Sequence, residues 1–255
     1  MSCPRKRKRV EGRARGAAAG LTLGLGALAL AAVSACSSLP PTAELGFTFL
    51  VTGERGSEYD AEQLTEIGAG HFANMDVLKG EGKLLLAGPF YDPLPDLGEL
   101  PAWRGVYIFA TDQLGDVATW TATDPGMVAG VFAADTYLLD GTATLAELPA
   151  REAAARAERL AADPETPYDG FVGRSYTVVL YPGADGFLET FTGLPEVPFS
   201  GRLAGPGPFD GHALVCLAAE TPEAARVYLD AHWGDDNGLI LCPWYASDQV
   251  ATLAP

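Results

Sequence analysis

The sequence predicts an α+β fold in which one chain carries two ferredoxin-like units, each with the element order βαββαβ. Three observations predict it. Short apolar runs alternate with helix-like patterns in that order, the same landmarks recur further along the chain, and an alanine-rich segment separates the two occurrences. We therefore expect a first unit at residues 45–140, a helical linker at 141–173 and a second unit at 174–255.

Each element of the first unit follows from the spacing of its apolar residues. Short apolar runs bounded by glycine or proline are typical of buried strands, whereas apolar residues three and four apart indicate a helix. On this basis the expected elements are a strand at 46–51, a helix at 61–79, strands at 83–87 and 105–110, a helix at 113–123 and a strand at 131–139.

The second unit is predicted from landmarks that recur. At an offset of 108 residues, the aromatic and glycine positions Trp120, Gly126, Gly130 and Tyr137 align with Tyr228, Gly234, Gly238 and Tyr245. A helix is expected to begin at Thr221-Pro222, because threonine is favoured at the N-cap and proline at the first helical position.

Two connecting segments are expected to differ in structure. Within the second unit, residues 184–199 join the first two strands, and Gly193, Pro195 and Pro198 favour an irregular loop in place of a helix. Between the units, the alanine-rich residues 145–162 predict a helix that ends at Asp163-Pro164.

The first 35 residues have the layout of a secretory signal peptide. A basic segment precedes an uncharged stretch that closes on Val33-Ser34-Ala35-Cys36. These four residues resemble the lipobox of bacterial lipoproteins, which implies a signal peptide at 1–35, lipidation of Cys36 and a tether at 36–44. The alternative is a retained membrane anchor, since a span needs about 20 apolar residues. Both interpretations place the folded part outside the cytoplasm, and we expect a lipid anchor on the extracytoplasmic face of the cell membrane.

The net charge excludes one class of partner. Removal of the leader, which holds seven basic residues and one acidic residue, changes the formal net charge from −16 to −22. A surface this acidic repels phosphate backbones, so we expect no nucleic-acid partner.

Two cysteines, Cys216 and Cys242, remain in the folded part. An oxidising compartment permits a disulfide between them. The predicted strands that carry them are not neighbours, however, which favours two buried free thiols.

One histidine of the first helix lies where an apolar residue is expected. An apolar stripe on this helix is formed by Leu64, Ile67, Met75 and Leu78. His71 lies at the centre of the stripe, and an inward-facing imidazole needs a partner because an unsatisfied buried nitrogen costs about 1–3 kcal/mol.

Four segments of the first unit, taken together in their order and spacing, are specific for one protein family. They are residues 70–78, residues 82–92, the strand start Arg104-Gly105 and residues 124–132. Together they resemble the YCII-related (YciI-like) domain. The resemblance implies a ferredoxin-like fold of the dimeric α/β-barrel type, whose single-unit members pair their sheets between chains. A chain with two units is therefore expected to form this pair internally and to remain a monomer.

The same resemblance implies an enzymatic centre made of a histidine and an aspartate. The histidine maps to His71 and the aspartate to Asp124, with Asp92 as the second choice. The carboxylate would orient the imidazole, which takes and returns a proton. The structural alternatives are a core histidine bound to a helix or loop and an Asp-Pro pair that only ends a helix.

The second unit is expected to be a degenerate copy. It has no counterpart of His71, and His232 takes the place of Asp124. His212 and His232 lack the spacing of a known metal site, so no metal is expected. No cofactor is expected either, because the chain has no phosphate loop or dinucleotide fingerprint.

Two functions remain open at this point. The first is an enzyme that uses His71 and Asp124 for acid–base chemistry on a small organic molecule. The second is a non-catalytic lipoprotein that binds a small ligand or acts as a scaffold, with a vestigial site. The sequence identifies no substrate.

Overall fold

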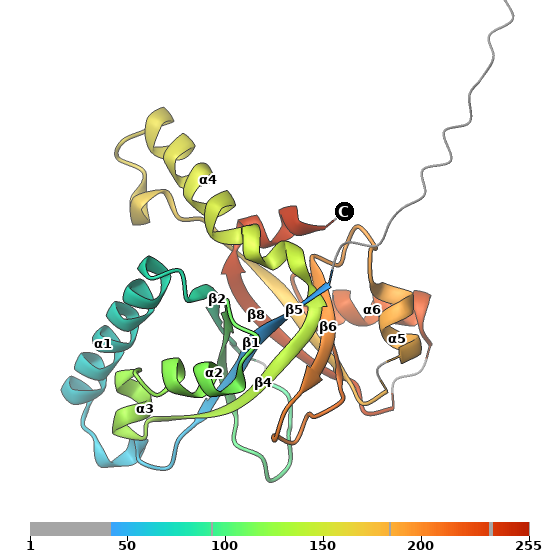
Figure 1. Cartoon of the computed structure of the whole chain (residues 1–255), viewed down its shortest axis with the longest axis horizontal. Coiled ribbons are helices and arrows are strands. Elements are labelled where there is room, and N and C mark those ends of the chain that lie inside the picture. Colours follow the sequence, from blue (N-terminus) through green and yellow to red (C-terminus); the bar gives the residue numbers. More distant parts are fainter. Residues whose placement is uncertain (1–41, 93, 184, 235–236, 255) are drawn as a thin grey trace, which may run out of the picture. The chain divides into compact units, whose positions relative to one another are not determined.

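The computed structural model describes residues 42–92, 94–183, 185–234 and 237–254, which belong to one compact unit (Figure 1). The expected signal peptide at 1–35, the lipidation site Cys36 and most of the tether lie outside the described residues. Among the helices in the described ranges, none combines the length and the apolar composition that crossing a membrane requires.

The first half of the folded part confirms the predicted βαββαβ order. Its elements are β1 (Thr42–Thr52), the 3-10 helix η1 (Gly56–Glu58), α1 (Ala61–Gly80), β2 (Leu84–Pro89), β3 (Trp103–Phe109), α2 (Leu114–Thr121), α3 (Pro125–Ala129) and β4 (Phe132–Thr142). The sequence predicts one helix at 113–123, whereas the structure has the second, short helix α3 directly after it. The reason is local, because Asp124 caps α3 and proline suits its first position.

Helix α1 begins at a capping box. The Asp60 carboxylate accepts a hydrogen bond from the backbone N–H of Gln63 at 2.9 Å, and the Gln63 side chain accepts one from the N–H of Asp60 at 3.0 Å. The predicted apolar stripe of this helix is buried only in part: Leu78 is buried, whereas Leu64 is 38% exposed. The stripe therefore faces the core at Leu78, whereas Met75 and His71 line a pocket.

The second half begins after a helical connection, as predicted. The connection consists of the 3-10 helix η2 (Ala143–Glu147), α4 (Leu148–Ala162) and the 3-10 helix η3 (Pro167–Gly170). The elements that follow are β5 (Gly173–Tyr181), α5 (Asp185–Phe191), β6 (Phe199–Ala204), β7 (Ala213–Leu217), α6 (Pro222–His232), β8 (Ile240–Ser247) and the 3-10 helix η4 (Asp248–Leu253). The N-cap predicted at Thr221 is confirmed, since its hydroxyl accepts from the N–H of Ala224.

The expected irregular loop at 184–199 is wrong in its first part, because residues Asp185–Phe191 form helix α5. Phe187 and Phe191 lie four residues apart, are fully buried and pack with ring centroids 4.7 Å apart. This apolar pair provides the burial that stabilises a short helix in spite of the glycine and prolines that follow it.

The strands of the described residues form one antiparallel sheet of eight, in the order β2-β3-β1-β4-β6-β7-β5-β8. The halves join where β4 pairs with β6, with Gly141 opposite Gly201. The edge strands β2 and β8 also meet, because Phe90 bridges to Trp244 and the N–H of Tyr91 donates to the carbonyl of Pro243 at 3.2 Å. The sheet thus closes on itself, with α1, α2 and α3 on one side and α5 and α6 on the opposite side (Figure 1).

The largest core cluster combines both halves. Phe49 of β1 stacks on Trp103 of β3 with ring centroids 4.4 Å apart, and Tyr176 of β5 and Trp244 of β8 join the same cluster. Large buried aromatic rings contribute most of the apolar area in such a core. Smaller clusters lie beneath α1 and α2 and beneath α5 and α6.

The two cysteines are buried and free, which confirms the prediction of separate thiols. Val178 of β5 lies opposite both Cys216 of β7 and Cys242 of β8, so a whole strand separates the two residues. Burial raises the pKa of both thiols, which keeps them protonated within the core.

Candidate active site

His71 is brought to its partner by a close approach of two helices. It lies in the middle of α1, and a side chain added at the preceding Gly70 would come within 3.0 Å of Pro125 in α3. Glycine at this position therefore lets the two backbones approach, so that the residues next to the contact, His71 and Asp124, can meet. The His71 side chain is 14% exposed.

Asp124 has two separate tasks, one for each carboxylate oxygen. Its Oδ1 accepts a hydrogen bond from the backbone N–H of Gly126 at 2.7 Å and so caps α3. Its Oδ2 lies 2.6 Å from Nδ1 of His71. The Asp-Pro pair is therefore a helix start and a part of the site at the same time, and the side chain of Asp124 is fully buried.

A tyrosine completes the group. The hydroxyl of Tyr107, on β3, donates to Oδ2 of Asp124 at 2.7 Å and lies 3.1 Å from Nδ1 of His71. Because this hydroxyl proton is directed at the carboxylate, the proton between His71 and Asp124 belongs to Nδ1, which donates to Oδ2. Asp124 thus accepts from three donors: an imidazole, a phenol and a backbone amide.

These contacts determine which groups are charged. Burial by itself would raise the pKa of Asp124, but the hydrogen bonds from His71, Tyr107 and Gly126 outweigh it and lower the pKa, so Asp124 is ionised at neutral pH. Burial, and then the neighbouring Asp124 charge, raises the pKa of Tyr107, so its hydroxyl remains a donor. A fixed negative charge therefore lies directly behind the imidazole.

The arrangement leaves the other ring nitrogen of His71 available. With Nδ1 donating to Asp124, the neutral imidazole carries its lone pair on Nε2. Within the described part of the chain, Nε2 has no hydrogen-bond partner. Chemically, this combination is a base whose tautomer is fixed by a buried carboxylate.

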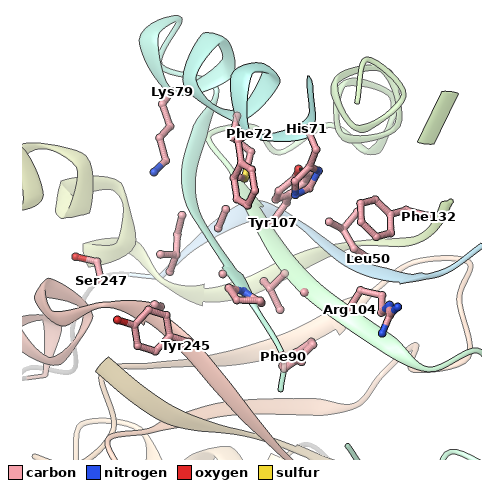
Figure 2. Close-up of a pocket in the computed structure, with 18 of the residues that line it drawn as sticks. Leu50, His71, Phe72, Lys79, Phe90, Arg104, Tyr107, Phe132, Tyr245 and Ser247 are labelled. Atoms are coloured by element: carbon pink, nitrogen blue, oxygen red, sulfur yellow. The ribbon is translucent and has the colours of Figure 1, made fainter. Parts of the chain in front are cut away.

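His71 and Tyr107 line a pocket of about 610 Å³. Figure 2 shows His71 and Phe72 extending from α1 on the same side as Tyr107, with Leu50 and Phe132 nearby. The wall comes from α1, β1, β2, β3 and β4, from α4 and from β8, and consists of Leu50, Gly68, His71, Phe72, Met75, Lys79, Leu86, Ala87, Gly88, Pro89, Phe90, Arg104, Gly105, Val106, Tyr107, Phe132, Glu152, Phe171, Tyr245, Ala246 and Ser247. Most of these side chains are apolar, as is usual for sites that bind small organic molecules.

The other residues considered from the sequence lie elsewhere. Asp92 is exposed after the end of β2 and does not line the pocket, so the structure brings together His71 and Asp124 but not Asp92. His232 Nδ1 lies 2.7 Å from the carbonyl of Tyr228 within α6, and His212 precedes β7. In the described ranges, no group of three or more histidine, cysteine, aspartate or glutamate residues is placed to hold a metal ion.

Tyr107 is the residue that sequence reasoning missed. It lies in the apolar run of β3, where an aromatic residue is typical of a buried strand and nothing distinguishes a site residue from a core residue. The one usable signal is its alternation with Val106 and Ile108, which face the closed core while Tyr107 faces α1.

Comparison with known protein families identifies one match. The model of the YCII-related domain matches residues 47–138, a range that contains His71, Tyr107 and Asp124. No curated protein and no solved structure matches the chain significantly. Residues 47–138 are therefore a YCII-related domain.

Proposed function

We propose that this protein is a lipid-anchored, extracytoplasmic acid–base enzyme that acts on a small organic molecule through His71 and Asp124. The observation that carries the proposal is the 2.6 Å contact between Nδ1 of His71 and Oδ2 of Asp124 at the wall of a pocket of about 610 Å³. A histidine kept only for packing would not need an ionised, fully buried aspartate behind it.

In the proposed reaction, Nε2 of His71 removes a proton from the bound molecule. The imidazole becomes an imidazolium whose charge is stabilised by Asp124, while the electron pair of the broken bond stays on the substrate. The same nitrogen then returns the proton to a different atom or to the same one. Tyr107 and the N–H of Gly126 hold Asp124 in place throughout, since both donate to its carboxylate.

The experiment measures proton exchange, because every reaction of this class begins with it. The full chain is incubated in D₂O with a panel of small carbon acids, such as 2-oxo acids and unsaturated lactones, and exchange is followed by proton NMR. We expect His71→Ala to lose the acceleration, while His212→Ala, which changes a histidine outside the pocket, retains it. Acceleration that His71→Ala retains in full would contradict His71 as the base, and no acceleration of any panel member by wild type would favour the non-catalytic binding or scaffold lipoprotein.

The proposed anchor is supported by the sequence of the leader. Lipidation is expected on Cys36 after removal of residues 1–35, and two or more acyl chains suffice for stable anchoring. Mass spectrometry of the protein extracted from membranes should find an N-terminal, acylated Cys36. The Cys36→Ala variant should carry no lipid and should lose this processing. An uncleaved leader on the membrane-bound wild type would contradict the lipoprotein assignment and favour the retained anchor.

We also propose that the two halves are a tandem pair of ferredoxin-like units, the second one degenerate, that reproduce a dimer within one chain. Support comes from the strand order, which is β2-β3-β1-β4 in the first half and β6-β7-β5-β8 in the second, and from the closure of the sheet at β2 and β8. Because the edge strands β2 and β8 meet each other at Phe90 and Trp244, we expect that neither edge is open to a further copy. Light scattering of the full chain should give the mass of one chain, and a mass of two chains would contradict the proposal.

A further inference from the structure

The pocket extends beyond the YCII-related domain. Glu152 of α4, Phe171 and the β8 residues Tyr245 to Ser247 form part of its wall and come from outside residues 47–138. Figure 2 shows Lys79, Tyr245 and Ser247 on one side of His71 and Arg104 on the other. The pocket that holds the candidate base therefore has two cationic side chains in its wall, Lys79 and Arg104.

The charges of the described residues are distributed unevenly. Seven of the ten lysine and arginine residues after the leader have a carboxylate partner within 4.0 Å, namely Arg55, Lys83, Arg151, Arg156, Arg159, Arg174 and Arg202. The other three, Lys79, Arg104 and Arg226, have no such partner among the described residues, and the first two of them line the pocket. In a chain with an excess of acidic residues, these two cations have remained unpaired at one site.

The one carboxylate of the pocket wall outside the His71 group does not cancel them. Glu152 has a side chain that is only 14% exposed, and its Oε1 lies 3.6 Å from Arg156 on the next turn of α4. Its charge is thus shared with an arginine that does not line the pocket. Asp124 offsets one of the two cations, Lys79 and Arg104, so the pocket keeps an excess of positive charge that is expected to favour a negatively charged group.

The apolar wall indicates the rest of the ligand. Phe72 is 63% exposed although it lines the pocket, and Met75, Phe132 and Phe171 add further apolar surface. A large exposed aromatic side chain at the mouth of a pocket is stabilised when a flat apolar body covers it. The volume of about 610 Å³ is in the range of pockets that hold small organic molecules.

We infer that the pocket binds an amphipathic organic anion, such as an aromatic or alicyclic carboxylate, with Lys79 and Arg104 as its anion-binding residues and Phe72 beneath its apolar body. This inference rests on the proposed function, because it names the substrate class of the His71 site. It also gives the second half a role without a base of its own, since Tyr245 and Ser247 of β8 line the pocket on the same side as Lys79.

The test uses two probes of the same shape and different charge, 2-naphthoate and its neutral analogue 2-naphthamide, titrated into the full chain by calorimetry. Wild type is expected to bind the anion about 10-fold more tightly, because a charge-assisted hydrogen bond is worth about that factor. The Lys79→Gln/Arg104→Gln double variant is expected to bind both probes equally. Lys83→Gln, a lysine paired with Glu81 outside the pocket wall, serves as the matched control and should keep the preference.

Phe72→Ala should lower the affinity for both probes by a similar factor, and this loss would show that both probes bind in this pocket. Equal affinity of wild type for the two probes, no binding of either, or a preference that survives in the double variant would overturn the inference. The result is separable from the proposed function. If His71→Ala keeps the preference for the anion and wild type shows no proton exchange, the binding inference is supported and the proposed enzyme is contradicted. If wild type exchanges protons but does not prefer the anion, the enzyme is supported and the binding inference is contradicted.

Discussion

Replacement of Asp124 by asparagine is expected to slow the proposed proton transfer about 1,000-fold while the protein stays folded. An asparagine can direct its amide NH₂ at Nδ1 of His71, which then accepts a hydrogen bond and leaves its proton on Nε2. In that tautomer the nitrogen facing the pocket is a donor and cannot remove a proton. Asparagine also provides no negative charge behind the imidazolium. Geometry is nearly preserved, but the chemistry is lost.

The measurement is the exchange rate of the best carbon acid found for wild type, compared among Asp124→Asn, His71→Ala and the double variant. Because His71 and Asp124 would act as one unit, the double variant should be little slower than either single variant. Asp92→Asn is the control, since this aspartate was the second choice from the sequence and is exposed outside the pocket wall. If Asp92→Asn slowed exchange and Asp124→Asn did not, the assignment of the aspartate would be wrong.

Removal of the Asp124 carboxylate altogether is expected to lower the free energy of unfolding by about 3–5 kcal/mol at neutral pH. Asp124→Ala leaves three donors without an acceptor: the Nδ1–H of His71, the hydroxyl of Tyr107 and the N–H of Gly126. Tyr107 is buried, so water cannot readily replace the lost partner. The first turn of α3 also loses its cap.

This stabilisation should depend on pH in a defined direction. The pKa of Asp124 in the folded protein is lower than its ordinary value of 3.8, because the hydrogen bonds from His71, Tyr107 and Gly126 outweigh the effect of burial. The unfolded state therefore binds the proton first on acidification. The contribution of Asp124 is fully present above the ordinary pKa and disappears as the pH falls below 3.8 towards the folded-state value.

Urea unfolding of wild type and Asp124→Ala at several pH values tests both statements. The difference in unfolding free energy should be largest near pH 7 and should shrink as the pH falls below about 4. Asp92→Ala, an exposed residue, should stay within about 0.5 kcal/mol of wild type throughout. A difference between wild type and Asp124→Ala that grew on acidification would contradict the ionised, hydrogen-bonded carboxylate.

The elements of the fold were largely predictable because their patterns are local. The strands around Phe47 and Tyr176, helix α1 and the cap at Thr221 follow from apolar spacing and capping residues that lie within a few positions of one another. Helix α5 was not predictable in this way. Its stability comes from Phe187 and Phe191 packing in a cluster with distant strands, and this burial outweighs the weak local preference.

The site was predictable only in part. His71 was identifiable because an imidazole at the centre of an apolar stripe needs a partner, and the family resemblance selected Asp124 rather than Asp92. Tyr107 was not identifiable, since its role depends on a hydroxyl placed 2.7 Å from a carboxylate that lies 17 residues further along the chain. The unpaired state of Lys79 and Arg104 was equally hidden, because ion pairing is a property of the folded surface.

The sequence by itself determined the α+β class, the order of the strands along the chain and the helices other than α3 and α5. It also predicts the candidate pair His71 and Asp124 and the lipidation of Cys36. These follow from residues close together in the chain or from a motif of fixed order. Only the tertiary structure decided that the sheet closes through Phe90 and Trp244, that Tyr107 joins the His71 group and that β8 forms a wall of the same pocket. The physical reason is that these features depend on contacts between residues 17 to more than 150 positions apart, whose distances no local pattern records.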